Sequence, residues 1–363
     1  MNDTHKKCLK LVLALLCTQL LSACGGDHPT PGPAGSAIRK QSRQITIDHE
    51  RMAALVKELA SAKYNGRLAG SQGDKLTQAY LLQQFKELGL LPANQHSYLQ
   101  SFSSTIVEPD GESHGNPANP MLGSKVQSNN ILGLLPGSDP VLKHQVIIVS
   151  AHHDHLGWTN DGRYYPGAND DLSGLAAMLE LARAFKTLAQ TGSPPRRSLL
   201  FVAYGAEEQH EMGSMYHAAH PLPDFPNDAI SLMISIDMIG QGYQAWRQFT
   251  PEQTASYVDS WMRQMQNQDK DDSDEFSHEY PPQDGKTFSY DAGPFAQLGI
   301  NNRVFGLARG IPHYHQVSDT WEHVDYQSAA VFTQAIFEFL RQVDLLPAKN
   351  SRPTSTGKAK PPQ

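Results

Sequence analysis

Three short apolar runs constrain the fold of this chain more than any other feature. The runs are Val146–Val149, Leu199–Ala203 and Ile230–Ile236. Each is mostly apolar, as expected of a strand that is buried on both faces of a parallel sheet. We therefore expect an α/β fold, in which helices flank both faces of a mostly parallel or mixed central sheet.

Acidic and histidine side chains follow the end of every one of these runs. His152 and Asp154 follow the first run, Glu207 and Glu208 the second, and Asp237 the third. Open α/β sheets bind their ligands beyond the carboxyl ends of the strands. The three strands are therefore expected to bring these side chains to one site.

A helical pattern begins directly after two neighbouring aspartates, Asp170 and Asp171. Apolar residues recur at a spacing of three and four residues from Leu172 to Phe185. An aspartate suits the N-cap and the first turn of a helix, because it interacts favourably with the free N–H groups there. One of the two aspartates can therefore have a purely structural role.

Further patterns indicate helices before and after the strands. They cover His49–Leu59, Lys75–Leu88 and Gln327–Val343. Ser101–Gln127 is rich in proline and glycine, and Gln266–Lys286 is rich in charged and amide side chains. Both stretches are expected to be surface loops, with rims or lids of an active site as the alternative.

Five short motifs, in their order along the chain, resemble those of the M28 peptidases. This zinc-dependent family groups bacterial leucyl-type aminopeptidases with glutamate carboxypeptidases. The resemblance covers roughly residues 45–345 and implies the zinc-dependent exopeptidase fold, which is phosphorylase/hydrolase-like. The motifs are Ala151–Asp154, Pro166–Asp171, Glu207-Glu208, Ile236-Asp237 and Pro312–His315.

The resemblance implies a centre that holds two zinc ions. Zinc binds histidine nitrogen and carboxylate oxygen, and a catalytic zinc keeps one position open for water. A two-metal centre also needs a carboxylate that contacts both ions. By resemblance Asp170 is this bridge. The other ligands are His152 and Asp237 for one zinc, and Glu208 and His315 for the other.

The same motifs imply roles for the remaining acidic residues. Glu207 is left without a metal and is expected to be the general base, which accepts a proton from water as that water attacks the peptide carbonyl. Asp154 is expected to accept the free ring N–H of His152 and so to fix its orientation. Asp171 is assigned to the helix start. The histidines expected not to be ligands are His153, His155 and His313, among sixteen in the chain.

Weaker motifs lie outside this set. Ser289-Tyr290-Asp291, Phe295 and Gly299-Ile300 resemble elements near the family's substrate pocket, although the usual proline after Gly-Ile is replaced by Asn301. Side-chain specificity therefore stays open. Asp319 is expected to support the loop of His315. Arg67 belongs to an Arg-x-x-Gly-Ser element and is expected in a loop packed near the sheet.

The N-terminal sequence indicates export and lipid attachment. Three lysines precede the apolar segment 11–21, which is short for a membrane-spanning helix and typical of a secretory signal. Leu21-Ser22-Ala23-Cys24 resembles the lipobox of bacterial lipoproteins, which implies cleavage before Cys24 and a diacylglyceryl anchor on its thiol. An ordinary secreted protein is the alternative.

The expected organisation follows from this processing. Residues 1–23 are the signal peptide, 24–43 the lipidated cysteine and a flexible tether, 44–346 the peptidase domain, and 347–363 a disordered tail. The mature chain then keeps only Cys24 among its cysteines, so no disulfide is expected. Gly25 after the anchor is compatible with the outer membrane of a Gram-negative bacterium, facing the periplasm.

Composition narrows the remaining function classes. A net charge of −7 gives no basic field for nucleic acid, and no phosphate-binding glycine loop occurs. We expect an aminopeptidase that acts on peptides. The alternatives are a carboxypeptidase, a related glutaminyl cyclase that uses one zinc, and a catalytically inactive envelope lipoprotein that binds peptide or metal. Native metal and oligomeric state stay open.

Overall fold

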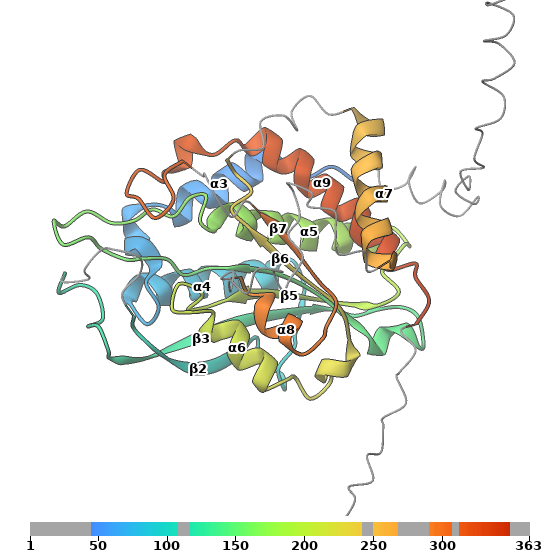
Figure 1. Cartoon of the computed structure of the whole chain (residues 1–363), viewed down its shortest axis with the longest axis horizontal. Helices are drawn as coiled ribbons and strands as arrows, with labels where there is room; N and C mark the ends of the chain where they lie inside the picture. The colour runs from blue at the N-terminus through green and yellow to red at the C-terminus, as the bar shows by residue number, and fades with distance from the viewer. Residues whose placement is uncertain (1–44, 108–115, 242–249, 268–289, 307–311, 349–363) are drawn as a thin grey trace, which may run out of the picture. The chain divides into compact units, whose positions relative to one another are not determined.

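The computed structural model describes residues 45–107, 116–241, 250–267, 290–306 and 312–348. These residues form a mixed sheet with helices on both sides (Figure 1). The strands are β1 Leu91–Pro92, β2 Leu99–Thr105, β3 Lys125–Leu135, β4 Val146–His152, β5 Ser198–Tyr204, β6 Ile230–Asp237 and β7 Asn302–Gly306. The helices are α3 His49–Leu59, η1 Ala62–Arg67, α4 Gln72–Glu87, α5 Leu172–Gln190, α6 Met212–Ala219, α7 Pro251–Asn267, α8 Gly293–Gln297 and α9 Tyr326–Val343; short 3-10 turns are η2 Leu142–His144, η3 Asn227–Ala229 and η5 Trp321–His323.

The strand order of the sheet is β1-β3-β5-β4-β6-β7, and β2 pairs with β3. Strands β5, β4, β6 and β7 run parallel, whereas β3 is antiparallel to β5 and also to β1 and β2. The expected mixed sheet of an α/β fold is thus confirmed. The parallel part carries all three strands whose ends were expected to form the site.

The parallel strands are buried on both faces because their side chains alternate between two apolar layers. In β4, Ile147 and Val149 pack in the larger core, whereas Val146 and Ile148 pack in the second one on the opposite face. The larger core includes residues of α3, α4, α5, α7 and α9, and the second one includes residues of α6 and α8. Figure 1 shows α3, α5, α7 and α9 on one side of the sheet, and α6 and α8 on the other.

The helices begin where the sequence supplies a cap. Asp48 accepts from the amides of Glu50 and Arg51 at the start of α3, and Ser71 accepts from the amide of Asp74 at the start of α4. The expected helix His49–Leu59 is confirmed, and the other two expected helices differ from α4 and α9 by a few residues at their ends. Such differences are usual, because helix ends are the least sharply defined part of a helix.

One expected loop is partly wrong. Strands β2 and β3 occupy both ends of Ser101–Gln127, where they pair antiparallel from Leu99 opposite Ile131 to Thr105 opposite Lys125. Most of Gln266–Lys286 lies outside the described residues, as does the N-terminal segment with Cys24. Among the helices of the described part, none has the length and apolar character needed to cross a membrane.

Candidate metal centre

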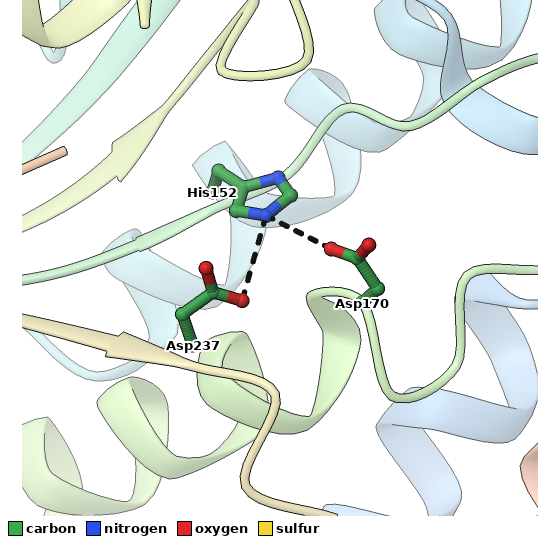
Figure 2. Close-up of side chains that lie close together, drawn as sticks. All are labelled: His152, Asp170 and Asp237. Atoms are coloured by element: carbon green, nitrogen blue, oxygen red, sulfur yellow. Dashed lines mark ion pairs between the residues drawn. The ribbon is translucent and has the colours of Figure 1, made fainter. Parts of the chain in front are cut away.

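Two ligand candidates lie at the ends of adjacent parallel strands. His152 is the last residue of β4 and Asp237 the last of β6. His152 Nε2 lies 3.8 Å from Asp237 Oδ1, and the two residues are 2% and 5% exposed (Figure 2). We call this pair the strand half of the centre. Its position follows from the register of β4 and β6.

Glu208 and His315 form a second pair, which we call the loop half. Glu208 lies in the turn after β5, and His315 in the segment between β7 and α9. Glu208 Oε2 lies 3.2 Å from His315 Nε2, and the His315 side chain is 15% exposed. His315 has a backbone φ of 53°, in the left-handed region that is unusual for residues other than glycine.

Asp170 lies between the two halves. Its Oδ1 is 3.2 Å from Nε2 of His152, and its Oδ2 is 3.3 Å from Nε2 of His315. Each carboxylate oxygen thus faces a different half. This is the arrangement that a carboxylate bridging two metal ions requires. Figure 2 shows Asp170 and Asp237 pointing at the same ring nitrogen of His152.

His155 also lies inside the centre, and this corrects the expectation that it is not among the side chains able to hold a metal ion. Its Nδ1 is 2.6 Å from Glu208 Oε1, and the residue is fully buried. Its other ring nitrogen, Nε2, has no hydrogen-bond partner. His155, Asp170 and Glu208 form one group of side chains able to hold a metal ion, and His152, Asp170 and Asp237 form another. The available signal was its place three residues after His152, beyond the same strand end.

Two further aspartates hold the main chain of the centre. Asp171 is the N-cap of α5, as expected, and accepts from Gly174 N at 3.0 Å. The same carboxylate accepts from His152 N at 3.1 Å and from Met238 N at 3.1 Å, so it ties the ends of β4 and β6 together. Asp319 accepts from Asp170 N at 3.1 Å and from Asn169 N at 3.0 Å. It therefore supports the main chain at Asp170.

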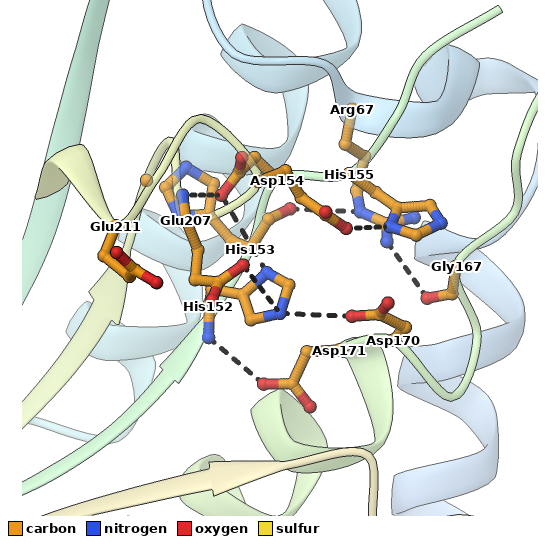
Figure 3. Close-up of polar contacts among 12 residues, drawn as sticks. Arg67, His152, His153, Asp154, His155, Gly167, Asp170, Asp171, Glu207 and Glu211 are labelled. Atoms are coloured by element: carbon orange, nitrogen blue, oxygen red, sulfur yellow. Dashed lines mark hydrogen bonds and ion pairs between the residues drawn. The ribbon is translucent and has the colours of Figure 1, made fainter. Parts of the chain in front are cut away.

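Glu207 lies beside the strand half without being part of either metal-holding group (Figure 3). Its Oε2 is 3.9 Å from His152 Nε2, and the residue is 7% exposed. Asp154 differs from expectation in one contact. Its Oδ1 is 3.9 Å from His152 Nδ1, beyond hydrogen-bond distance, and it accepts instead from the Glu207 amide at 3.0 Å. Asp154 thus fixes the backbone of Glu207.

The charges of the centre act strongly on one another. Burial by itself would raise the pKa of Asp170, but hydrogen bonds from His152 and His315 hold that pKa well below its usual range. Burial by itself would lower the pKa of His315, whereas the carboxylates of Glu208 and Asp170 raise it to about 11. Burial raises the pKa of Glu207 well above that of an ordinary glutamate. The buried carboxylates of the centre therefore favour a positive charge between them, such as that of protonated His315.

The residues of the centre fit zinc in chemistry and in burial. Histidine nitrogens and carboxylate oxygens are the zinc ligands of catalytic sites. Asp237 Oδ1 is buried without a hydrogen-bond partner, and such an atom is costly unless a cation or a donor compensates it. A divalent cation between His152, Asp170 and Asp237 would supply that compensation.

The other residues singled out from the sequence lie elsewhere. His153 Nε2 pairs with Asp74 Oδ1 at 3.1 Å in the buried interior, and His313 hydrogen-bonds to Ser318 Oγ at 2.8 Å. Neither belongs to the two metal-holding groups found among the described residues. Phe295 is fully buried and packs edge-on against His217, so it is a core residue. Ser289 lies outside the described residues.

Comparison with known proteins adds family evidence. The sequence model of peptidase family M28 matches residues 130–340. Aminopeptidase YwaD of Bacillus subtilis is 26% identical over 352 residues, which cover 89% of this chain and 71% of the relative. All residues of the candidate centre fall inside the match to the family model.

Solved structures share the fold. BSAP, a zinc aminopeptidase from Bacillus subtilis, superposes with a TM-score of 0.56 at 17% identity, over 82% of this chain and 96% of its own. A glutaminyl cyclase from Porphyromonas gingivalis also gives a TM-score of 0.56, at 15% identity, over 82% of this chain and 99% of its own. The overall fold therefore does not separate these two activities, and the distinction depends on the site.

Proposed function

Because this chain belongs to peptidase family M28 and is a hydrolase of peptide bonds, we propose that it is an aminopeptidase with a two-zinc centre. Asp170 carries the proposal, since its two oxygens face His152 at 3.2 Å and His315 at 3.3 Å. One zinc would be held by His152, Asp170 and Asp237, and the other by Asp170, Glu208 and His315. The bound ions would acidify a water molecule and polarise the peptide carbonyl.

Glu207 is the proposed general base. Its side chain lies beside His152, with Oε2 at 3.9 Å from Nε2, yet outside both metal-holding groups. It would accept a proton from the attacking water and deliver that proton to the amine that leaves. Glu207 N donates to Asp154 Oδ1 at 3.0 Å. This hydrogen bond fixes the main chain of Glu207, and it would help to orient the Glu207 carboxylate for the reaction.

The same acids suit a substrate with a free N-terminus. Glu207 and Asp237 are both buried at the edge of the centre, and a substrate ammonium group would offset their negative charge. A peptide with a blocked amine would lose this contact. We therefore infer that the enzyme removes residues from the N-terminus, while its side-chain preference is set by a pocket that these residues do not define.

The test uses free and N-acetylated peptides with the zinc-loaded chain and its Glu207→Gln variant. We expect sequential release of N-terminal residues from the free peptides only. The variant should keep both zinc ions but lose about 10²–10⁴-fold in kcat, the range for a general base. A variant as active as the parent would show that Glu207 is not the base.

Two other outcomes identify the competing functions. Release from the C-terminus would assign the chain to the carboxypeptidases of the family. One tightly bound zinc, together with cyclisation of N-terminal glutamine, would favour the glutaminyl cyclase. The full set of five candidate ligands favours the aminopeptidase over the single-zinc cyclase. A catalytically inactive binding protein would release nothing from any peptide.

We also propose that the enzyme is an outer-membrane lipoprotein that faces the periplasm of a Gram-negative bacterium. The support is the lipobox-like sequence Leu21–Cys24, followed by Gly25. Intact-mass analysis of the processed chain tests this proposal. A mass that begins at Cys24 and includes a diacylglyceryl group is expected, whereas an unmodified N-terminus at any position would contradict it.

A further inference from the structure

Arg67 is a buried cation that donates to four main-chain carbonyls. The residue is 0% exposed. Its Nε donates to His153 O at 3.0 Å, Nη1 to Pro166 O at 2.6 Å and to Leu59 O at 3.3 Å, and Nη2 to Gly167 O at 3.0 Å. Burial lowers the pKa of Arg67 to about 10, so it stays a cation at neutral pH. Burying a charge is costly, so its position calls for a physical explanation.

Three of the four accepting carbonyls belong to the two segments that carry ligands of the centre, and the fourth, that of Leu59, lies at the end of α3. His153 stands between His152 and Asp154, directly after β4. Pro166 and Gly167 precede the bridging Asp170 in its own segment. A guanidinium group is planar and presents its donors in a fixed geometry. One side chain therefore fixes the distance between these two segments, and Figure 3 shows it beside His155 and Gly167.

The main chain around Arg67 adds two contacts to the first of these segments. His155 N donates to Arg67 O at 3.4 Å, and Gly157 N donates to Gly66 O at 2.8 Å. The turn needs glycine at position 66, because its φ is 67° and a Cβ there would lie 2.3 Å from Gly157 O. The turn and the side chain of Arg67 thus form one unit packed against the ligand segments.

The charge of Arg67 has a second consequence for the centre. The carboxylates of Asp154, Asp170, Asp319 and Glu208 attract its charge, so each of them favours the cation and raises the pKa of Arg67 against the effect of burial. The positive charge in turn reduces the repulsion among these acids. It does so without occupying a ligand position, because its donors are directed to carbonyl oxygens.

We propose that Arg67 is a positioning residue of the metal centre, which sets the spacing between the segment of His152 and the segment of Asp170. This inference rests on the proposed zinc centre and adds a residue that contacts neither metal nor substrate. Shortening the side chain would remove the fixed fork of donors and let the two segments move apart. Zinc affinity should then fall even where the fold survives.

Arg197 supplies a matched control. It is 2% exposed, and its guanidinium donates to Asp344 O at 3.0 Å, Leu346 O at 3.1 Å and Pro347 O at 2.7 Å. It precedes β5, at the end of the strand opposite to Glu207 and Glu208. Arg197 is therefore another buried arginine that donates to main-chain carbonyls, but it lies away from the ligands of the centre.

The test measures zinc affinity by competition with a chelator in the parent, Arg67→Lys and Arg197→Lys. We expect Arg67→Lys to bind at least one zinc about tenfold or more weakly, the effect typical of residues that orient ligands. Arg197→Lys should bind zinc like the parent. Parent-like affinity in Arg67→Lys, or equal weakening in both variants, would overturn the inference. A parent chain that binds no zinc would instead contradict the proposed function.

A second measurement needs no variant and so does not depend on Arg67→Lys folding. Hydrogen exchange of the parent is compared with and without zinc. The amides of His155 and Gly157, which bond to the turn of Arg67, should exchange at least about tenfold more slowly with zinc bound. The amide of Ser198, which donates to Gln145 O at 3.1 Å beside Arg197, should change less. No difference between these amides would overturn the inference.

Discussion

The strand half and the loop half of the centre are held in place by different kinds of structure. His152 and Asp237 end two strands that are paired along their length, from Ile147 opposite Leu232 to Ser150 opposite Ser235. The separation of the two side chains is therefore set by the backbone of the sheet. We therefore expect the strand half to keep its geometry before any metal binds.

The loop half depends on side chains instead. Glu208 follows β5 in an irregular turn, in which Ala206 has a φ of 56°. His315 is held between Asp170 and Glu208, and His155 contacts the other oxygen of Glu208. No strand pairing fixes these positions relative to one another. We expect the loop half to be the more easily disturbed, and to gain more order from a bound ion.

The largest effect should come from the residue that joins the halves. Asp170→Asn replaces one carboxylate oxygen by an amide nitrogen, which cannot bind a metal ion. We expect loss of zinc from both halves and a fall in kcat/KM of more than about 100-fold, beyond the range of residues that only orient a ligand. Metal content and kinetics measure this.

Asp161→Asn is the control for that substitution, because Asp161 is an exposed aspartate nearby in sequence. It should keep two zinc ions and parent-like activity. If Asp170→Asn kept one zinc ion firmly bound and lost the other, Asp170 would serve one half alone. The strand half and the loop half would then be two separate metal sites.

The sequence was informative where the backbone decides the position of a side chain. Buried parallel strands read as continuous apolar runs, and their carboxyl ends meet at one edge. The sheet itself, and the position of His152 and Asp237 at one of its edges, could be predicted in this way. The edge strand β2 was missed because its burial alternates along the strand, so it shows no continuous apolar run. Its place in a segment rich in proline and glycine favoured a loop.

Side chains that meet only through tertiary structure could not be derived from periodicity. The metal roles of all five candidate ligands, Glu208 and His315 included, were assigned by resemblance to family motifs, and His155 was expected not to be a ligand. A single histidine has no pattern of its own, and its contact with Glu208 needs β4 and β5 to lie side by side. Arg67 was expected near the sheet, but its four carbonyl partners come from three separate segments.

An intermediate effect should distinguish the two histidines of the loop half. His315 Nε2 lies within 3.3 Å of both Asp170 and Glu208, whereas His155 Nδ1 contacts Glu208. We expect His315→Gln to lower the zinc content from two ions to one. His155→Gln should keep both ions but weaken the loop-half zinc by about 10–100-fold, since it orients a ligand.

Zinc content and chelator competition measure this difference in the same preparations. The reverse result, with one ion lost only in His155→Gln, would make His155 the ligand and His315 the supporting residue. Equal loss in both variants would indicate that the two histidines bind the same ion. Either result would change the ligands assigned to the loop half and leave those of the strand half as they are.

The smallest expected effect tests why the strand half is rigid. Asp171→Asn retains one acceptor oxygen but turns an amide group toward a buried N–H, because the carboxylate accepts from His152, Gly174 and Met238. A buried donor left without an acceptor costs about 1–3 kcal/mol. We expect this loss in the free energy of unfolding of the zinc-free chain, measured with urea.

Asp325→Asn is the matched control at the N-cap of another helix. Asp325 is the N-cap of α9, and its carboxylate accepts from Ser328 N at 3.2 Å and from Ser328 Oγ at 2.8 Å. Asparagine caps helices about as well as aspartate, so this variant should lose less than about 1 kcal/mol. A similar loss in both variants would mean that Asp171 acts only as a cap. In that case the pairing of β4 with β6 alone would fix the strand half, and its zinc affinity should be unchanged in Asp171→Asn.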